Sequence, residues 1–267
     1  MRSSGEQPTD FVEALANGLA ILECFDAAHP EMSLSDVARR VGLSPATARR
    51  SLITLMTLGY VGQRHKRFHL KPRIMTLGSA FHFSSRVDEL LQPEVRNLVA
   101  RFGDASSVGT LDGCDVIYVA HASVQRARRA TAVVGARYPA HATSMGRVLL
   151  AALPDAEINR RITSKPLAAL TSQTCIDPCA LRAELDTVRA NGYATTVDQL
   201  DYGITALAVP IRDMKGRSIA ALNSSGYTGI VTPEGLVAER LPALREAAAH
   251  ISQEISRFPV LQSMACD

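Results

Sequence analysis

The first concentration of residues that could do chemistry is a basic stretch, Ser33 to Arg73. This stretch contains nine Lys and Arg residues and a single acid, Asp36, so its formal charge is +8. Residues 1–32 carry a formal charge of −5 and residues 74–267 carry none, which leaves the whole chain at +3. Positive charge that is concentrated in one segment predicts a surface that contacts phosphate groups.

Two short helices with a tight connection are predicted within this stretch. Ser33 is a typical N-cap with Asp36 at the third helical position, and Gly42 is typical of the left-handed residue that ends a helix. Ser44 and Pro45 have the residue types of a second N-cap and of the first position of the second helix. Helices that are joined by so short a glycine-containing turn favour a helix-turn-helix.

The second helix has one face suited to a core and one suited to DNA. On a helical wheel, Ala48, Leu52 and Leu55 point inward, and the first turns of the opposite face carry short side chains and arginines. Short side chains let a helix enter a major groove, where arginine can pair with guanine or phosphate. After Gly59, two short strands around a basic tip predict a wing along the phosphates or the minor groove. The candidate DNA-contacting residues are Ser44, Pro45, Ala46, Thr47, Arg49, Arg50, Arg64, Lys66 and Arg67.

Each of these features by itself is more typical of an ordinary solvated surface, because short motifs match by chance. A helix-turn-helix, a wing and a charge of +8 in one consecutive stretch together favour DNA binding.

The rest of the chain changes from a helical to a strand-rich pattern. Residues 74–102 are helical in pattern, with a break expected near Leu91–Gln92 because Pro93 follows. Segments rich in Val, Ile, Thr and Ala come next, with helical segments between and after them. This order predicts an α+β fold with a winged helix-turn-helix (11–73), a linker helix (74–102) and an antiparallel-sheet domain (103–260). The expected strands are 106–111, 114–122, 130–135, 193–198, 206–213 and 217–226, and the expected helices are 144–153, 179–191 and 233–258.

Composition and cysteine usage limit the class of protein. The chain is 46% hydrophobic and 21% charged, so it can bury an ordinary core. No apolar run approaches the roughly 20 residues of a membrane-spanning helix, and residues 1–10 lack the apolar stretch of a signal peptide. Five scattered cysteines are typical of reduced thiols, so a cytoplasmic location is expected. Cys175 and Cys179 could share a helical face, but no His or further Cys lies near them in sequence, and neither a metal nor a cofactor is expected.

Three segments of the chain carry a resemblance to a known family. They are LSDVARRVGLSPATARRSLITLMTLGYV, YPAHATSMGRVLLAALP and GITALAVPIRDMKGRSIAALNSSG. With them, the chain from Phe11 to Phe258 resembles the IclR family of bacterial transcription regulators. SPATARR and HATSMGR resemble the subgroup that regulates the β-ketoadipate pathway and 4-hydroxybenzoate catabolism.

This resemblance implies a winged helix-turn-helix, a linker helix and a GAF-like effector-binding domain. It also implies a homodimer, which often pairs into a homotetramer, and a double-stranded DNA operator. The implied effector is a small organic acid of the 4-hydroxybenzoate, protocatechuate or β-ketoadipate type. RNA polymerase is a further partner that such a regulator could contact.

The resemblance also implies where the effector binds. Carried over by position, it gives Thr143, Ser144, Met145, Gly146, Asp198, Asn223 and Ser225. The residue chemistry agrees, because Thr143 or Ser144 would cap the following helix, whose free N–H groups can bind a carboxylate. Asn223 and Ser225 alternate along one strand and face the same side, where they could hydrogen-bond ring hydroxyls or form a polar strand end without a ligand.

Other polar residues near this site have less specific roles. Tyr138 could add a stacking face, and for His141 a structural hydrogen bond is favoured over contact with a ligand. Arg126, Arg128 and Arg129 could hold an acidic ligand, although a solvated turn or a subunit contact is favoured for them.

Two other classes of protein remain open. A small-molecule-converting enzyme, such as a hydrolase with a winged-helix interaction module, should show a nucleophile with a base, a metal set or a phosphate loop. The motifs GGxG, GxSxG and HExxH are absent, and Ser144 and His141 have no evident orienting acid, so no catalytic residue is assigned. A purely structural DNA binder would not need a polar pocket. The favoured hypothesis is therefore a DNA-binding transcriptional regulator of aromatic-acid catabolism genes that is controlled by a small aromatic or dicarboxylic acid.

Overall fold

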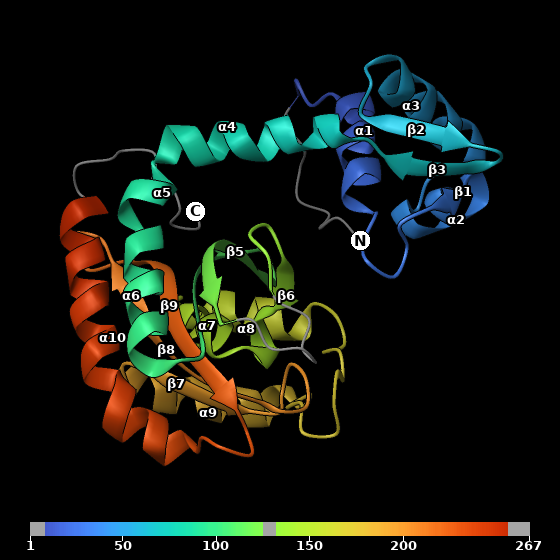
Figure 1. The fold of residues 1–267 in the computed structure, drawn as a ribbon. Helices are drawn as coiled ribbons and strands as arrows, with labels where there is room; N and C mark the ends of the chain where they lie inside the picture. The colour runs from blue at the N-terminus through green and yellow to red at the C-terminus, as the bar shows by residue number, and fades with distance from the viewer. Residues whose placement is uncertain (1–8, 125–131, 256–267) are drawn as a thin grey trace. The chain divides into compact units, whose positions relative to one another are not determined.

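The computed structural model describes residues 9–124 and 132–255 of the chain (Figure 1). The chain forms two compact units that divide between Phe81 and His82. The first unit is a helix-turn-helix with a small antiparallel sheet, and the second is a larger antiparallel sheet with helices on both faces. The predicted α+β class, with the winged helix-turn-helix before the antiparallel-sheet domain, is confirmed.

The first unit forms where the local sequence signals predict it. The Ser33 side chain accepts a hydrogen bond from the Asp36 N–H, and the Ser44 side chain accepts one from the Thr47 N–H. Between these caps, Gly42 has a φ of 69°, a left-handed conformation that glycine adopts without strain. The elements are α1 (Glu13–Glu23), β1 (Met32–Ser33), α2 (Leu34–Val41), α3 (Pro45–Thr57), β2 (Val61–Arg64) and β3 (Arg67–Leu70), with the strands in the order β1-β3-β2.

Helical segments follow the wing up to Phe102. The break expected near Leu91–Gln92 is present, because one helix ends at Leu90 and Pro93 lies in the first turn of the next. An additional break occurs at Arg86, which has a φ of 53° and no glycine or proline beside it that would have predicted it. The elements are η1 (Pro72–Ile74), α4 (Met75–Ser85), α5 (Val87–Leu90) and α6 (Gln92–Phe102).

The second unit is built on an antiparallel sheet with the strand order β6-β5-β4-β9-β8-β7. Hairpins at Gly113 and Gly216, both with positive φ, connect β4 to β5 and β8 to β9. Pro242 lies inside α10, which continues through it. The strands are β4 (Ala105–Asp112), β5 (Asp115–Ser123), β6 (Arg137–Pro139), β7 (Ala194–Val197), β8 (Ile204–Arg212) and β9 (Ser218–Tyr227), and the helices are η2 (Ala140–Ala142), α7 (Ser144–Ala151), α8 (Asp155–Thr163), α9 (Pro178–Asn191) and α10 (Pro233–Ile255).

The prediction of a strand at 130–135 is wrong for the part that the structure describes, residues 132–135. Residues 130 and 131 lie outside the described residues, and 132–135 form no strand. The chain instead turns at Gly135, which has a φ of 86°, and the strand β6 begins at Arg137. Gly135 and Ala136 already exchange backbone hydrogen bonds with Tyr118 of β5, so the pairing with β5 starts at the turn and continues into β6.

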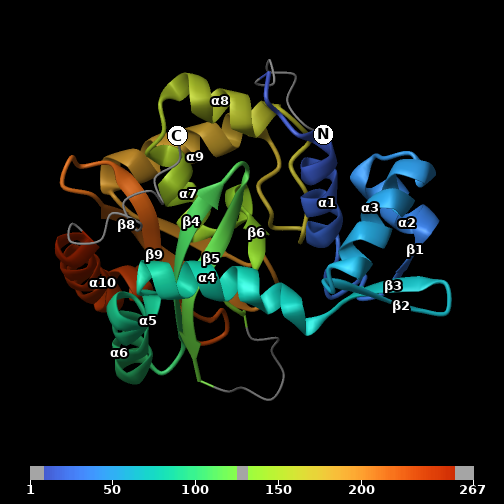
Figure 2. The same cartoon turned by 90° about the horizontal axis from the view of Figure 1, so that it is seen from above.

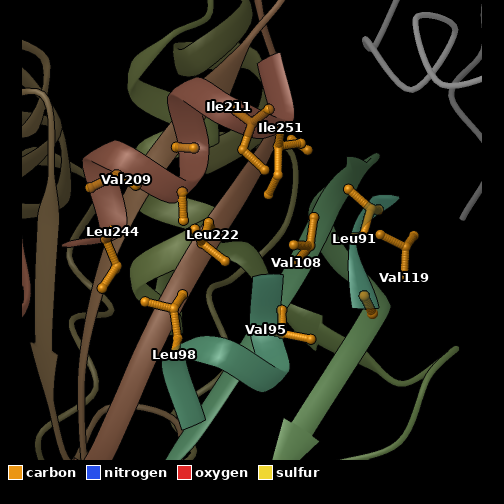
Figure 3. Packing of buried hydrophobic residues seen from close by; sticks show 14 of the residues in the cluster. Leu91, Val95, Leu98, Val108, Val119, Val209, Ile211, Leu222, Leu244 and Ile251 are labelled. Atoms are coloured by element: carbon orange, nitrogen blue, oxygen red, sulfur yellow. The ribbon is translucent and has the colours of Figure 1, made fainter. Parts of the chain in front are cut away.

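The two faces of the larger sheet pack against different helices (Figures 1 and 2). One face packs on α6 and α10, where Leu91, Val95 and Leu98 meet sheet residues such as Val108 and α10 residues (Figure 3). The opposite face packs on α7, and α8 and α9 extend the same core beyond α7. Because side chains alternate along a strand, Leu222 of β9 faces α10 while the next residue, Asn223, faces the α7 side. The cavity described below lies on this α7 side.

Candidate functional site

The exposed face of α3 carries the residues that the helical wheel placed there. Ala48 and Leu52 are fully buried, whereas Ala46, Arg49 and Arg50 are exposed. Ser44 and Pro45 are exposed at the start of α3, and Thr47 is half-buried there. The predicted division of α3 into a core face and an outward face is therefore present.

The wing is the hairpin of β2 and β3. Arg64 and Arg67 are paired opposite each other across the hairpin, with His65 and Lys66 at its turn. All four side chains are exposed, and His65 takes the positive φ of 54° that the turn requires. Arg67 also donates a hydrogen bond to the Glu31 carbonyl at 3.2 Å.

The ion pairs divide the basic residues of this unit into two groups. In α2, Arg39 pairs with Asp36 at 2.6 Å and Arg40 pairs with Asp26. Among the described residues, no acid forms an ion pair with the arginines of α3 or with the basic residues of the wing. In the described parts of the chain, the basic side chains of α3 and the wing, like Lys71 and Arg73 after the wing, therefore carry positive charge that can pair with phosphates. The residues of this second group are Arg49, Arg50, Arg64, Lys66 and Arg67.

The second unit contains a cavity of about 430 Å³ between the sheet and the segments around the start of α7. Its size is in the range of small-molecule sites, roughly 300–1,000 Å³. Its described lining combines aromatic, small apolar and neutral polar side chains with two acids, and it includes no Lys or Arg. The lining residues are Asp104, Ala105, Ser107, Tyr118, His121, Ser123, Val124, Ala132, Tyr138, Pro139, Ala142, Thr143, Ser144, Leu170, Thr196, Leu200, Asp201, Ile204, Ala206, Asn223 and Ser225.

Two cross-strand rows of residues form the sheet side of the cavity. In the first row, Ser107 of β4 is paired with His121 of β5 and with Asn223 of β9. The Ser107 N–H donates to Asn223 Oδ1 at 2.8 Å, and the Ser107 hydroxyl lies 2.9 Å from His121 Nδ1. The second row pairs Ala105 with Ser123 and Ser225. In each row the outer residues on β5 and β9 are polar and the central β4 residue is small, which leaves space for a ligand over the sheet.

A β-bulge determines which β5 side chains reach the cavity. Val108 of β4 pairs with Ala120 and the next residue, Gly109, pairs with Tyr118, so Val119 has no partner in the ladder. The extra residue changes the alternation of side chains, and Tyr118 and His121 both line the cavity although they are three residues apart. Without the bulge, residues at this spacing would point to opposite faces of the sheet.

The start of α7 contributes polar groups from the opposite side. The Thr143 hydroxyl accepts a hydrogen bond from the Gly146 N–H at 3.0 Å and so caps the helix. The Ser144 hydroxyl is buried and has no hydrogen-bond partner among the described residues. N–H groups in the first turn of a helix lack partners within the helix, so this end of α7 can bind an anion.

The structure brings four of the expected effector residues together and places three elsewhere. Met145 is fully buried in the core under α7. Gly146 packs against the Ala140 backbone, where a Cβ atom would lie 2.1 Å from the Ala140 oxygen. The Asp198 carboxylate accepts hydrogen bonds from the Gly203 N–H at 2.8 Å and the Thr228 hydroxyl at 2.7 Å, and it lines no part of the cavity. The four that line it are Thr143, Ser144, Asn223 and Ser225.

The other polar residues near the expected site differ in role, since Tyr138 lines the cavity and His141 makes a structural contact. His141 is buried, and its Nε2 atom lies 3.0 Å from the Ala168 carbonyl, which confirms the structural role favoured for it. Burial lowers the pKa of the His141 imidazole. Arg126, Arg128 and Arg129 lie outside the described residues.

Several cavity residues were missed by the sequence reasoning. His121 and Ser107 lie in expected strands, but neither strand alone indicates that they meet. Tyr118 was also missed, and its ring packs edge to face on that of Tyr138, the residue expected to add a stacking face, with ring centroids 5.0 Å apart; burial raises the pKa of both phenols. Asp201 lies in the loop that follows Asp198, so a shift of three residues would have found an acid at the cavity.

Two features expected of an enzyme, a metal-ligand cluster and a nucleophile with its base, are not formed by the described residues. No group of three or more His, Cys, Asp or Glu side chains in the described parts of the chain could hold a metal ion. The Ser144 hydroxyl has no hydrogen-bond partner there, and the His141 Nε2 atom is engaged by the Ala168 carbonyl, so the two do not form a nucleophile and base. No helix in the part of the chain that was searched is long and apolar enough to cross a membrane.

The two units together define a class of protein. One unit presents a helix-turn-helix and a wing, in which the basic residues of α3 and of the wing have no acidic partner among the described residues, and the other contains a cavity of small-molecule size. A DNA-binding head joined to a ligand-binding domain is the architecture of a ligand-responsive transcriptional regulator.

The chain belongs to the IclR family of bacterial transcriptional regulators. Residues 14–65 match the IclR helix-turn-helix domain, and residues 83–253 match the bacterial transcriptional regulator IclR C-terminal domain. The resemblance that the sequence motifs indicated is thereby confirmed.

Similarity extends over most of the chain. It is 35% identical over 247 residues to the Pca regulon regulatory protein of Pseudomonas putida, with 92% of this chain and 85% of the relative covered. It is 34% identical over 245 residues to the p-hydroxybenzoate hydroxylase transcriptional activator of Acinetobacter baylyi, with 90% of each covered. A solved IclR homolog from Microbacterium hydrocarbonoxydans, complexed with 4-hydroxybenzoate, has a TM-score of 0.69 at 27% identity and covers 91% of this chain and 99% of its own.

Proposed function

We propose that this chain regulates the transcription of genes for aromatic-acid catabolism, and that an aromatic acid bound in the cavity changes its affinity for operator DNA. The observation that carries the proposal is the cavity itself, where a helix N-terminus, tyrosine rings and polar strand residues line one space. Two relatives whose names refer to the Pca regulon and to p-hydroxybenzoate hydroxylase support the aromatic class of effector. The protein acts by binding, and no catalytic residue is assigned to it.

The proposed DNA interface consists of α3 and the wing. α3 enters the major groove with its first turns, where Ala46 leaves space for a close approach and Arg49 and Arg50 reach bases or phosphates. Arg64 and Lys66 of the wing contact phosphates or the minor groove. Ser44, Pro45 and Thr47 lie at the start of α3, where the helix approaches the backbone of the DNA.

Replacing Arg50 by alanine is expected to cost about 1–3 kcal/mol of binding to the specific operator, because a bidentate arginine–guanine contact is lost. Binding to non-specific DNA should fall much less. Lys66→Ala is the matched comparison, since loss of a phosphate contact weakens specific and non-specific binding alike. The measurement is fluorescence anisotropy with operator and scrambled duplexes. Equal losses on both duplexes for Arg50→Ala would remove Arg50 from base recognition.

The proposed effector site uses the two sides of the cavity differently. The carboxylate of the acid binds at the start of α7, near Thr143 and Ser144, because N–H groups in the first turn of that helix lack partners within the helix. The ring lies against Tyr118 and Tyr138, and its substituents meet the polar strand residues. Asn223 is suited to this role, since its Oδ1 atom accepts from Ser107 and its amide N–H groups remain to donate.

The proposed route from the effector to the DNA-binding unit passes through residues 74–102. Gln92 begins α6 and donates a hydrogen bond to the carbonyl of His121, a cavity residue, at 2.9 Å. At the other end of α6, the Phe102 ring packs against the Arg240 guanidinium, which pairs with the cavity residue Asp104. Effector binding can change the DNA-binding arrangement only if the acid binds two arrangements with different affinity.

The proposed functional form is a homodimer, and its assembly into a tetramer stays a prediction. The first unit exposes large apolar side chains on α1, including Leu15 and Leu19, and on α4, including Met75 and Leu77. Such a concentration of exposed apolar surface is typical of a protein–protein contact. A second copy of the chain is the proposed partner, because helix-turn-helix dimers bind two half-sites of one operator.

Titration with aromatic acids tests the proposal as a whole. Fluorescence anisotropy is measured with DNA from the upstream region of the chain's own gene, at several salt concentrations, with and without 4-hydroxybenzoate, protocatechuate or β-ketoadipate. We expect specific binding with a steep salt dependence and a change in affinity on addition of one of these acids, with acetate as the inactive control. If none of the acids changed either the DNA affinity or the melting temperature, the proposed function would be wrong.

A further inference from the structure

We propose that His121 selects hydroxylated aromatic acids over unsubstituted ones, through a hydrogen bond between its Nε2 atom and a ring hydroxyl of the effector. This inference rests on the proposed function and adds a residue that determines its specificity. His121 lies on β5, and its side chain lines the cavity.

The Nε2 atom of His121 needs a partner. It is buried and has no hydrogen-bond partner among the described residues. A buried polar atom that stays unpaired costs free energy comparable to a lost hydrogen bond, so such atoms are usually paired with protein, water or ligand. Since His121 lines the cavity, a group bound in the cavity is suited to pair with it.

The orientation of the ring is fixed from its other nitrogen. His121 Nδ1 lies 2.9 Å from the Ser107 hydroxyl, and Ser107 is itself held by its N–H, which donates to Asn223 Oδ1 at 2.8 Å. The three residues form one cross-strand row on β5, β4 and β9. A ring that is held in this way presents Nε2 in a defined direction, and this is what discrimination between ligands requires.

The chemistry of the ring matches a hydroxyl better than a carboxylate. Burial lowers the pKa of His121 and so favours the neutral imidazole, which supplies no positive charge to an acid. The carboxylate has the start of α7 as a better partner. A neutral imidazole carries one donor and one acceptor, and whichever tautomer Ser107 selects, Nε2 can pair with a hydroxyl, which both donates and accepts.

A matched series of ligands and variants tests this role in the full chain. Isothermal titration calorimetry is carried out with benzoate, 3-hydroxybenzoate, 4-hydroxybenzoate and 3,4-dihydroxybenzoate. In the wild-type protein we expect at least one hydroxylated acid to bind on the order of tenfold more tightly than benzoate, as one well-placed hydrogen bond allows. In His121→Phe this preference should disappear, while benzoate binds within about threefold of its wild-type affinity.

Three further variants separate the loss of the His121 hydrogen bond from a folding defect in His121→Phe. His121→Gln keeps a hydrogen-bonding group and should retain part of the preference. Ser107→Ala releases the ring and should reduce the preference without removing it. His250→Gln changes an exposed imidazole on α10 that pairs with Glu94 at 2.8 Å, and it should leave the preference unchanged. If His121→Phe does not fold, as judged by circular dichroism, the Gln and Ala variants provide the comparison.

The outcomes separate this inference from the proposed function. If the wild-type protein binds none of these acids, the proposed effector class fails and the role of His121 fails with it. If it binds benzoate and the hydroxylated acids equally, the proposed function stands and the role of His121 is wrong. If His121→Phe prefers hydroxylated acids over benzoate as strongly as the wild-type protein does, the assignment is also wrong, and Nε2 pairs with a water molecule instead of the ligand.

Discussion

Replacing Arg240 by alanine is expected to lower the free energy of unfolding by about 3–5 kcal/mol, as for the removal of one partner from a buried ion pair. Arg240 lies on α10 and is only 4% exposed. Its guanidinium pairs with Asp104 at 2.7 Å, donates to the Ser224 hydroxyl at 3.0 Å and lies 5.1 Å from the centroid of the Phe102 ring. The substitution removes the guanidinium from a carboxylate whose side chain is 10% exposed, and the enclosed charge then loses its ion pair with Arg240.

Denaturant unfolding of the full chain, followed by circular dichroism, measures this effect. Arg245→Ala is the matched control, since Arg245 lies on the same helix, is exposed and, among the described residues, donates only to the Asn191 carbonyl. Its loss should cost less than about 0.5 kcal/mol. A double-mutant cycle of Arg240→Ala with Asp104→Ala should show a coupling of at least about 1 kcal/mol. Equal losses for the two arginine variants would mean that the ion pair does not stabilise the domain.

This ion pair also has a position relevant to the proposed regulation. Asp104 lines the cavity, and Phe102 is the last residue of α6. A destabilised pair would therefore disturb the cavity wall and the end of the linker helix together. The sequence gives no sign of this connection, because Asp104 and Arg240 are far apart in the chain and each is an ordinary charged residue by itself.

The winged helix-turn-helix could be predicted because its signals are local. Ser33, Gly42, Ser44 and Pro45 each specify a helix end within a few residues, and the structure forms the caps and the left-handed turn at these positions. The outward face of α3 followed directly from helical periodicity once those ends were known. Charge could be counted from the sequence, but its compensation could not, since the pairing of Arg40 with Asp26 depends on the fold.

The cavity was only partly predictable because it depends on pairing between distant strands. The start of α7 could be predicted from its cap, whereas Asn223 and Ser225 came from the family resemblance, and strand alternation indicated only that they face the same side. His121 could not be predicted, because the bulge at Val119 changes the alternation on β5, and the glycine at the bulge, Gly109, lies on the facing strand β4. The resemblance placed an acid near Asp198, but that carboxylate holds its own loop, so sequence position alone could not separate a ligand contact from a loop contact.

Replacing Gly146 by alanine is expected to destabilise the cavity domain by at least about 3 kcal/mol, at the upper end of the range for overpacked sites. A Cβ atom at this position would lie 2.1 Å from the Ala140 oxygen and 2.3 Å from its Cα atom. Those atoms belong to the backbone of η2, so no side-chain rotation can relieve the contact. Either α7 or η2 must move, and the Thr143 cap between them would be distorted.

Gly18→Ala is the control, because Gly18 lies within α1 and a Cβ atom there meets nothing within 4 Å. That substitution should be neutral or stabilising by about 0.5–1 kcal/mol, as for glycine in a helix interior. Unfolding curves and the affinity for an aromatic acid are measured for both variants. Gly146→Ala should lose stability and affinity together, because the same packing holds the start of α7 at the cavity. A stable Gly146→Ala variant with unchanged effector affinity would show that the close approach to Ala140 is not required.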